Sequence, residues 1–404
     1  MSSSKSGISK KRLKRLHDAA ENYVEAGQIA GAITLVERHG ETFIDVVGMA
    51  DRERKTPLKR DAIFRIASMS KPITAVATMI LVEEGKLRLD EPVDRLLPEL
   101  AKRQVLVDLA GPLENTVPAA RPITTRDLLT FRMGMGMVIG PPGSETPIQK
   151  AMAEHKIMGL KPPVPHEPDE WLAHFGQLPL MHQPGERWMY HTGSDVLGVL
   201  IARASGKPFE QFLKERIFEP LGMEDTGFSV PQNKLGRLTK CYSVNPETRA
   251  LEDYDDAEDS SWAKPPAFPA GGGGMVSTID DYLAFGRMML NKGVLGKERI
   301  LSRPSVEVMT TDQLTDEQKA ASPFFPGFWT GRGWGFGVSM STRRIGLAST
   351  PGRFGWDGAF GTSWASDPAE DMIGILMIQR MGFGPEPAGM NADFWTLAYQ
   401  SIDD

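Results

Sequence analysis

The chain has 404 residues, of which 41% are hydrophobic and 24% are charged, and its formal net charge is −6 at pH 7. A chain of this size can bury a sizeable core and is expected to form two domains, and the negative charge argues against nucleic acid as a partner. The only cysteine, Cys241, excludes an intrachain disulfide.

The N-terminal residues are polar and lead into a charged helix, without an apolar core of signal-peptide length. No later segment approaches the length of a membrane span. We therefore expect a cytoplasmic protein with no membrane partner. The seven histidines are scattered along the sequence, with neither an H-E-x-x-H motif nor a Cys/His pair, so no metal site is expected.

The N-terminal elements are typical of an α+β protein. Residues 9–26 carry apolar side chains at helical spacing and predict an amphipathic helix. Two β-rich runs, 32–38 and 41–47, flank His39-Gly40 and predict an antiparallel hairpin. Residues 62–67 predict a further strand. A helix followed by antiparallel strands favours an α+β fold over a Rossmann fold.

A buried helix follows the best candidate nucleophile, Ser68. The run 73–82 is apolar on nearly every face, and a serine at its beginning is an ordinary N-cap. Ser68 and Lys71 are also three residues apart and share a helix face. Lys71 can therefore be the base that a serine nucleophile needs, if burial lowers the pKa of its amine. The same S-x-x-K spacing occurs at Ser2–Lys5 in the polar tail, so only the context favours Ser68.

The middle of the chain, to about residue 235, is helical in pattern and contains long loops. Helical runs are expected at 126–130, 168–175, 195–204 and 209–218. Between Gly134 and Gly185 lie nine prolines, which predict a rigid irregular segment. This segment is either a surface excursion packed by its own side chains or a lid or wall of a substrate site.

The sheet is expected to resume in the last third of the chain. Strand-like runs lie at 334–340, 361–365 and 373–379, after an amphipathic helix at 280–291. The glycine run 271–274 lacks the order of a phosphate loop and predicts a close backbone approach in a tight turn. A closing helix at 391–402 can pack beside the N-terminal helix on the same sheet.

A serine nucleophile needs a further acid/base group and N–H donors for the developing oxyanion. Tyr190 precedes a polar turn and a predicted helix, and Trp356-Asp357-Gly358 forms a glycine-containing strand edge. Taken alone, a residue such as Tyr190 is more often a packed aromatic residue, and Asp357-Gly358 is more often a plain hairpin turn.

Together with Ser68-Met69-Ser70-Lys71, these segments resemble the serine β-lactamase and penicillin-binding-protein superfamily, and within it most of all the family VIII carboxylesterases. The resemblance covers nearly the whole chain. Further segments that resemble family signatures, in order, are 89–93, 123–130, 220–223, 272–278 and 333–335.

The resemblance implies a role for each site residue. Ser68 would be the acylated nucleophile, Lys71 its partner base and Tyr190 the tyrosine of the Y-x-N box, with Lys71 and Tyr190 as the acid/base groups. The backbone N–H groups of Ser68 and Ala359 would form the oxyanion hole. Residues implied or expected to contact the substrate are Trp356, Asp357, Gly358, Phe131, Met135 and Trp171. No metal or organic cofactor is implied.

Two departures from the β-lactamase pattern bear on the substrate. Thr192 replaces the asparagine of the box, which disfavours amides. Trp356 replaces the lysine of K-T-G, as in the W-G-G variant of the esterases, and Asp357 adds a negative charge. A β-lactam carboxylate would meet no cation there, whereas a neutral ester would not be repelled.

We therefore expect a serine hydrolase that cleaves small carboxylic esters. The alternatives are a β-lactamase or D-amino-acid peptidase of the same superfamily, or a non-catalytic ligand-binding relative. The implied fold is α/β, of the α+β type: a β-lactamase/transpeptidase-like antiparallel sheet flanked by helices. Residues 1–62 and 240–404 would form this sheet domain, and residues 63–239 a helical domain with an active-site loop at about 134–185. The physiological ester and the oligomeric state stay open.

Overall fold

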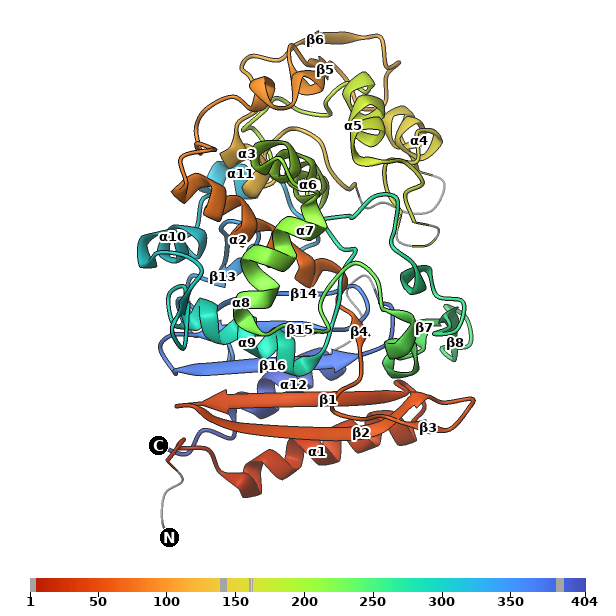
Figure 1. The fold of residues 1–404 in the computed structure, drawn as a ribbon, viewed down its shortest axis with the longest axis vertical. Coiled ribbons are helices and arrows are strands. Elements are labelled where there is room, and N and C mark those ends of the chain that lie inside the picture. Colours follow the sequence, from red (N-terminus) through yellow and green to blue (C-terminus); the bar gives the residue numbers. More distant parts are fainter. Residues whose placement is uncertain (1–4, 139–143, 160, 162, 383–388) are drawn as a thin grey trace.

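The computed structural model describes residues 5–138, 144–159, 161, 163–382 and 389–404. Its largest element is an eight-stranded sheet with the order β12-β13-β14-β15-β16-β1-β2-β3, in which every neighbouring pair is antiparallel (Figure 1). Helices cover the sheet, so the expected α/β fold with an antiparallel sheet flanked by helices is confirmed.

Both ends of the chain build the sheet. Its strands are β1 (Gly31–Arg38), β2 (Glu41–Asp51), β3 (Thr56–Pro57), β12 (Arg332–Trp334), β13 (Ser339–Ser341), β14 (Phe354–Asp357), β15 (Ser363–Asp367) and β16 (Met372–Ile378). Strand β1 is buried along its whole length because it pairs with β2 on one side and β16 on the other. The single strand expected at 334–340 is two strands, since the chain turns at Gly337, where φ is +70°.

Two terminal helices share one face of the sheet. Helix α1 (Lys10–Glu25) lies along β1 and β2 and packs beside α12 (Met390–Tyr399) in one apolar cluster (Figure 1). The expected pairing of the first and last helices is therefore confirmed. On the other face, α9 (Ile279–Leu290) packs against β15 and β16.

The helices between residues 70 and 221 extend from the top of Figure 1 down to the level of β14 and β15, where α8 lies. They are α2 (Ser70–Glu83), α3 (Thr125–Leu129), α4 (Pro147–Glu154), α5 (Pro168–Gln177), α6 (Thr192–Ser205), α7 (Phe209–Leu213) and α8 (Glu219–Leu221). Helix α2 is buried on every side from Ser70 to Leu81, as its composition predicts, and packs against α6. No helix among the described residues is long and apolar enough to cross a membrane.

The proline-rich segment 134–185 is more regular than the sequence predicts. It contains α4 as well as α5, because Thr146 and Gln149 form a capping box and Pro147 occupies the first turn of α4, where a missing N–H costs nothing. Apolar residues of both helices join the main core. Three of the prolines, Pro141, Pro142 and Pro162, lie outside the described residues.

The remaining described elements are short. They are the two-stranded sheets β4 (Phe64–Arg65) with β9 (Val276–Ser277), β5 (Gln104–Leu106) with β6 (Thr116–Pro118), β7 (Cys241–Val244) with β8 (Leu251–Asp255), and β10 (Val294–Leu295) with β11 (Glu298–Arg299), and the helices α10 (Arg303–Met309) and α11 (Asp316–Ala320). The strand expected at 62–67 is only the two residues of β4, which pairs with β9 outside the main sheet.

A buried ion pair fixes strand β4. The Arg65 guanidinium donates to the Asp255 carboxylate, to Ser260 Oγ at 3.0 Å and to the Thr239 carbonyl at 2.6 Å. Both charged side chains are almost fully buried, with exposed fractions of 1% and 0%. Burial by itself would raise the pKa of the Asp255 carboxyl, but Arg65 and the hydrogen bonds hold that pKa below its ordinary value.

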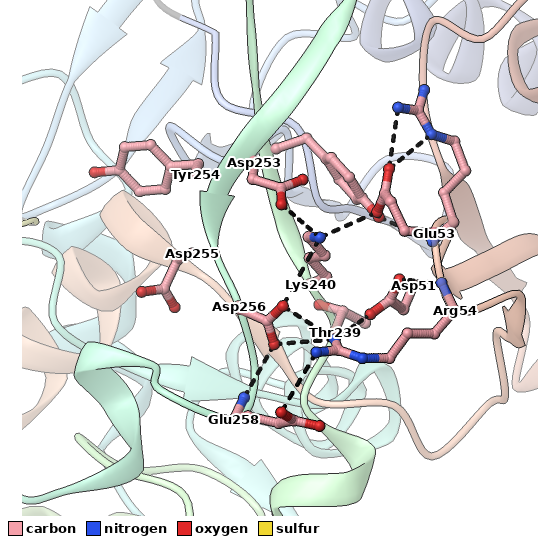
Figure 2. A network of polar contacts seen from close by, with 12 residues as sticks. Asp51, Glu53, Arg54, Thr239, Lys240, Asp253, Tyr254, Asp255, Asp256 and Glu258 are labelled. Carbon is pink, nitrogen blue, oxygen red and sulfur yellow. Dashed lines mark hydrogen bonds and ion pairs between the residues drawn. The ribbon is translucent and has the colours of Figure 1, made fainter.

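A second charged network lies beside this pair, with a buried lysine, Lys240, and acidic partners that are partly exposed to solvent. Figure 2 shows Asp253 and Asp256 pointing toward the Lys240 amine, while Asp255 points away from it. Lys240 also pairs with Glu53, so this network joins the end of β2 to the β7–β8 hairpin. Because Asp253 is 64% exposed, its ion pair contributes little to stability.

We expect Asp255→Asn to lower the free energy of unfolding by about 3–5 kcal/mol, because it leaves the Arg65 charge buried without a counter-ion. Asp253→Asn is the matched control and should cost about 1 kcal/mol or less. Urea unfolding monitored by tryptophan fluorescence measures both. Equal effects of the two substitutions would show that the buried pair does not anchor β4.

Candidate active site

Ser68 lies in a 3₁₀ turn, Ala67–Met69, between β4 and the first residue of α2, Ser70. It is not the N-cap of α2, since that position belongs to Met69. Ala67 has φ of +43°, an unusual conformation for a non-glycine residue that indicates local strain. Tyr282 Oη holds the turn by donating to the Met69 carbonyl at 2.8 Å. Ser68 itself is 6% exposed.

The Lys71 amine lies directly beside Ser68. Its Nζ is 2.9 Å from Ser68 Oγ, it donates to the Gly272 carbonyl, and it lies 3.1 Å from His191 Nδ1. The side chain is fully buried. Burial lowers the pKa of Lys71 to about 7, although the charge of Asp195 opposes this shift. The amine can therefore lose its proton near neutral pH.

His191 and Asp195 complete this network, and neither was among the residues chosen from the sequence. His191 Nε2 lies 3.2 Å from Asp195 Oδ2, and Asp195 Oδ1 accepts from the Gly272 N–H at 2.8 Å. Burial and the neighbouring Lys71 lower the pKa of His191. A neutral imidazole that donates Nε2–H to Asp195 offers Nδ1 as an acceptor to Lys71. The i,i+4 spacing of a histidine and an aspartate just after Tyr190 is the signal that predicts this pair.

The glycine run 271–274 makes this network possible. A side chain at Gly272 would place its Cβ 2.9 Å from Asp195 Oδ1 and 3.1 Å from the His191 ring. A side chain at Gly271 would collide with the Ser194 carbonyl at 2.4 Å. The expected close backbone approach in a tight turn is therefore confirmed. It brings the Gly272 carbonyl within hydrogen-bonding distance of the Lys71 amine.

Tyr190 closes the other side of the site. Trp356 Nε1 donates to Tyr190 Oη at 2.7 Å, and Lys71 Nζ lies 4.5 Å from the centre of the phenol ring. Burial raises the pKa of Tyr190 well above its ordinary value, while hydrogen bonding with Ser68 and Trp356 opposes the rise. The phenol is therefore protonated at neutral pH. Two backbone bonds, Met189 N–H to Phe131 O at 2.7 Å and Met137 N–H to Tyr190 O at 2.8 Å, hold this segment.

Aromatic side chains surround Tyr190 and Trp356. We call this set the aromatic cluster; its members are Phe131, Trp188, Tyr190, Phe328, Trp334 and Trp356. Trp334 and Trp356 meet edge to face with ring centres 4.7 Å apart, and Phe131 meets Tyr190 in the same way at 5.8 Å. Trp356, which stands where β-lactamases carry the lysine of K-T-G, is thus part of an apolar wall of the site.

Gly358 brings the β14–β15 turn against the segment before Ser68. A Cβ at Gly358 would lie 2.3 Å from the Ile66 carbonyl, which also accepts from Thr362 Oγ1 at 3.2 Å. Ala359, the next residue, donates its N–H to no backbone carbonyl among the described residues. Within the described part of the chain, the Ala359 N–H thus has no backbone acceptor, and it directly follows Gly358, which packs against Ile66 two residues before Ser68.

The other predicted substrate contacts lie elsewhere. Trp171 and Met135 are fully buried in the main core, where Trp171 stacks on Phe175 and donates its indole N–H to the Ile157 carbonyl at 2.9 Å. Neither has exposed surface to offer a substrate. Asp357 accepts hydrogen bonds from Ser363 and from Asn391 of α12. Because neighbouring residues of a strand point to opposite faces, its carboxylate faces α12, although its charge still helps to raise the pKa of Tyr190.

Comparison with known proteins agrees with this fold. The sequence model of the family described as Beta-lactamase matches residues 16–394. Protein Rv1367c of Mycobacterium tuberculosis (strain ATCC 25618 / H37Rv) is 41% identical over 362 residues, which cover 88% of this chain and 87% of that protein. Esterase EstB of Burkholderia gladioli is 30% identical over 384 residues, which cover 90% of this chain and 89% of EstB.

A solved structure extends the similarity to the whole molecule. EstCE1, described as a hydrolase with promiscuous acyltransferase activity, is 25% identical and has a TM-score of 0.76, covering 98% of this chain and 99% of its own. The family match and the alignment with EstB each span about nine-tenths of the chain or more, so the expected resemblance to β-lactamase-like esterases is confirmed. This protein therefore belongs to the Beta-lactamase family and is similar to esterases of that fold.

Proposed function

We propose that this protein is a carboxylesterase that cleaves small neutral esters through an acyl-enzyme on Ser68. The observation that carries the proposal is the contact of a fully buried amine, with a pKa of about 7, at 2.9 Å from the Ser68 hydroxyl. A neutral amine can accept the hydroxyl proton, which a permanently charged ammonium group cannot. The names of EstB and EstCE1, an esterase and a hydrolase, support the same chemistry.

Acylation begins when Ser68 Oγ attacks the ester carbonyl carbon and its proton moves to Lys71 Nζ. The backbone N–H groups of Ser68 and Ala359 donate to the oxyanion that forms. The new ammonium group has acceptors in the Gly272 carbonyl and His191 Nδ1. Asp195, on the far side of the imidazole, stabilises the positive charge.

Tyr190 then supplies the proton to the leaving group. Its protonated phenol donates to the departing alkoxide and is reprotonated from the Lys71 ammonium, while the Trp356 indole N–H stabilises the negative charge that develops on Oη. Water subsequently attacks the acyl carbonyl as the neutral Lys71 amine takes one proton from it, and Lys71 then returns this proton to Ser68 Oγ as the acyl–oxygen bond breaks. The acid leaves and Ser68 Oγ regains its hydrogen.

The surroundings of the site favour a small uncharged substrate. Ser68 is 6% exposed and Tyr190 4%, so bulky groups have little access. Trp356 presents an apolar surface in place of a cation, which suits the alkyl or aryl part of an ester. Transfer of the acyl group to an alcohol is the second candidate reaction, because the wall beside Ser68 is apolar and the similar EstCE1 is described as a promiscuous acyltransferase.

A phosphonate ester should label this protein once, on Ser68, because the buried Lys71 amine lies beside this hydroxyl and can activate it. Intact mass before and after treatment measures the adduct, and Ser68→Ala should abolish it. Ser363, the serine of Gly361-Thr362-Ser363-Trp364-Ala365, is the internal control, since its hydroxyl already donates to Asp357 and it is fully buried. An adduct on Ser363 would disprove the assignment of the nucleophile.

Ester hydrolysis should depend on a group with an apparent pKa near 7 that must be unprotonated. The kcat/KM should fall about tenfold per pH unit below that midpoint, since Lys71 is a base only when neutral. Asp195→Asn removes the charge that raises the pKa of Lys71, so the midpoint should move to lower pH. Asp169→Asn, at an 81% exposed side chain on α5, should leave the midpoint in place. An unchanged midpoint in Asp195→Asn would contradict the role of Asp195.

Hydrolysis of p-nitrophenyl acetate or butyrate should exceed that of a chromogenic cephalosporin by several orders of magnitude in kcat/KM. The carboxylate of the cephalosporin would lose its bound water beside Trp356 without meeting a cation there. This uncompensated desolvation costs several kcal/mol of binding free energy. Arg353, the nearby cation in sequence, is not free to help, because its guanidinium stacks on Trp395 of α12 at 3.9 Å.

The variants Trp356→Lys and Trp356→Phe separate charge from the lost hydrogen bond to Tyr190. Both remove the indole donor, and only Trp356→Lys should gain activity on the cephalosporin relative to the ester. Preference of the unmodified protein for the cephalosporin would favour the β-lactamase alternative. Activity on neither substrate, without labelling of Ser68, would favour the non-catalytic alternative.

A further inference from the structure

Three histidines that are scattered in the sequence come together beside α5, near the C-terminal end of α4. His155 is the C-cap of α4, His166 lies two residues before α5, and His174 lies in the last turns of α5. Glu170 stands between the latter two, four residues from each. The ring centres of His166 and His174 are 4.6 Å apart, and those of His155 and His174 are 5.3 Å apart. None of these residues belongs to the proposed active site.

The distances between the polar atoms suit a metal ion. His166 Nδ1 lies 3.4 Å from Glu170 Oε2, and His174 Nε2 lies 3.9 Å from Glu170 Oε1. One ligand atom from each of the three residues lies within 4.8 Å of the others. Ligands about 2.1 Å from a tetrahedral Zn²⁺ are about 3.4 Å apart, so small side-chain adjustments would bring all three into contact with one ion.

The other ring nitrogens are already oriented as in metal sites. His166 Nε2 lies 3.0 Å from the His155 carbonyl, to which it donates, and this leaves the Nδ1 lone pair facing Glu170. His174 Nδ1 lies 3.1 Å from His155 Nδ1, so one of the two rings donates to the other. If His174 is the donor, its Nε2 lone pair faces Glu170. Histidine ligands commonly donate their second N–H to a carbonyl or another acceptor in this way.

We propose that His166, Glu170 and His174 bind one Zn²⁺ ion, with water completing the coordination and His155 acting as a positioning residue for His174. An ion can reach the site from solvent because the side chains of His174 and Glu170 are 32% and 57% exposed. Two imidazoles and one carboxylate are a ligand set typical of zinc. The ion would join the segment before α5 to the helix and, through His155, to the end of α4.

A second group, His17 with Asp18 and Glu21, serves as the control. Its three ligand atoms also lie within 4.8 Å of one another, but it has a single imidazole, and His17 Nδ1 already lies 2.8 Å from Asp45 Oδ2. His17→Gln therefore removes a histidine and leaves the proposed zinc site intact.

The test is zinc binding by the full chain after treatment with a chelator. Calorimetry and metal analysis should find one Zn²⁺ per chain, and saturating zinc should raise the thermal midpoint by about 2–4 °C. The double variant His166→Gln/His174→Gln should lose both effects, while His17→Gln should keep them. His155→Gln should weaken binding about 10–100-fold without changing the stoichiometry. Co²⁺ should give visible absorption bands of four- or five-coordinate geometry in the unmodified protein only.

Two results would overturn the proposal. One is the absence of zinc binding by the unmodified protein, in which case the contacts of Glu170 with His166 and His174 only hold the segment before α5 against the helix. The other is zinc binding that survives in His166→Gln/His174→Gln, which would place the ion elsewhere. Circular dichroism of the double variant separates loss of the site from loss of the fold.

Discussion

The active site depends on one constraint, the burial of the Lys71 amine without a carboxylate in contact with it. A contacting carboxylate would hold the amine as a permanent ammonium group, and Ser68 would then have no base. The protein instead places Asp195 beyond the His191 ring, where its charge only partly offsets the effect of burial. The all-round burial of α2 and the glycines at 271–274 are both consequences of enclosing this amine.

Enclosing the amine requires unusual backbone at two positions. Ala67 and His191 both have positive φ, at +43° and +87°, and such residues cost about 1–3 kcal/mol each. Both lie next to a side chain of the proposed mechanism, Ser68 in one case and Tyr190 in the other. The surrounding fold holds them: the Arg65–Asp255 pair fixes the strand that enters the Ser68 turn, and Tyr282 binds the carbonyl that follows it.

In the proposed mechanism, selectivity arises from the absence of a cation at position 356. Trp356 both completes the aromatic cluster and donates to Tyr190, so one side chain removes the cation that would attract an anionic ligand and supports the proton donor. Asp357 accepts a hydrogen bond from Asn391 of α12, and its negative charge still acts on Tyr190, where it raises the pKa of the phenol. Discrimination against anions then rests on the uncompensated loss of water, which affects charged substrates and leaves neutral ones unaffected.

The sequence by itself determined the features that depend on neighbours along the chain. Helical spacing predicts α1 and α9, uniform apolarity predicts the buried α2, and the three-residue spacing places Ser68 beside Lys71. Tertiary structure decided which distant groups meet these elements. The contact of Lys71 with His191 joins residues 120 positions apart. Trp171 is a core residue because Phe175 and Phe268 enclose it. The three histidines of the proposed zinc site converge only because the end of α4 lies near α5. Side-chain direction and long-range contact follow from how whole elements pack, and local sequence carries no record of that packing.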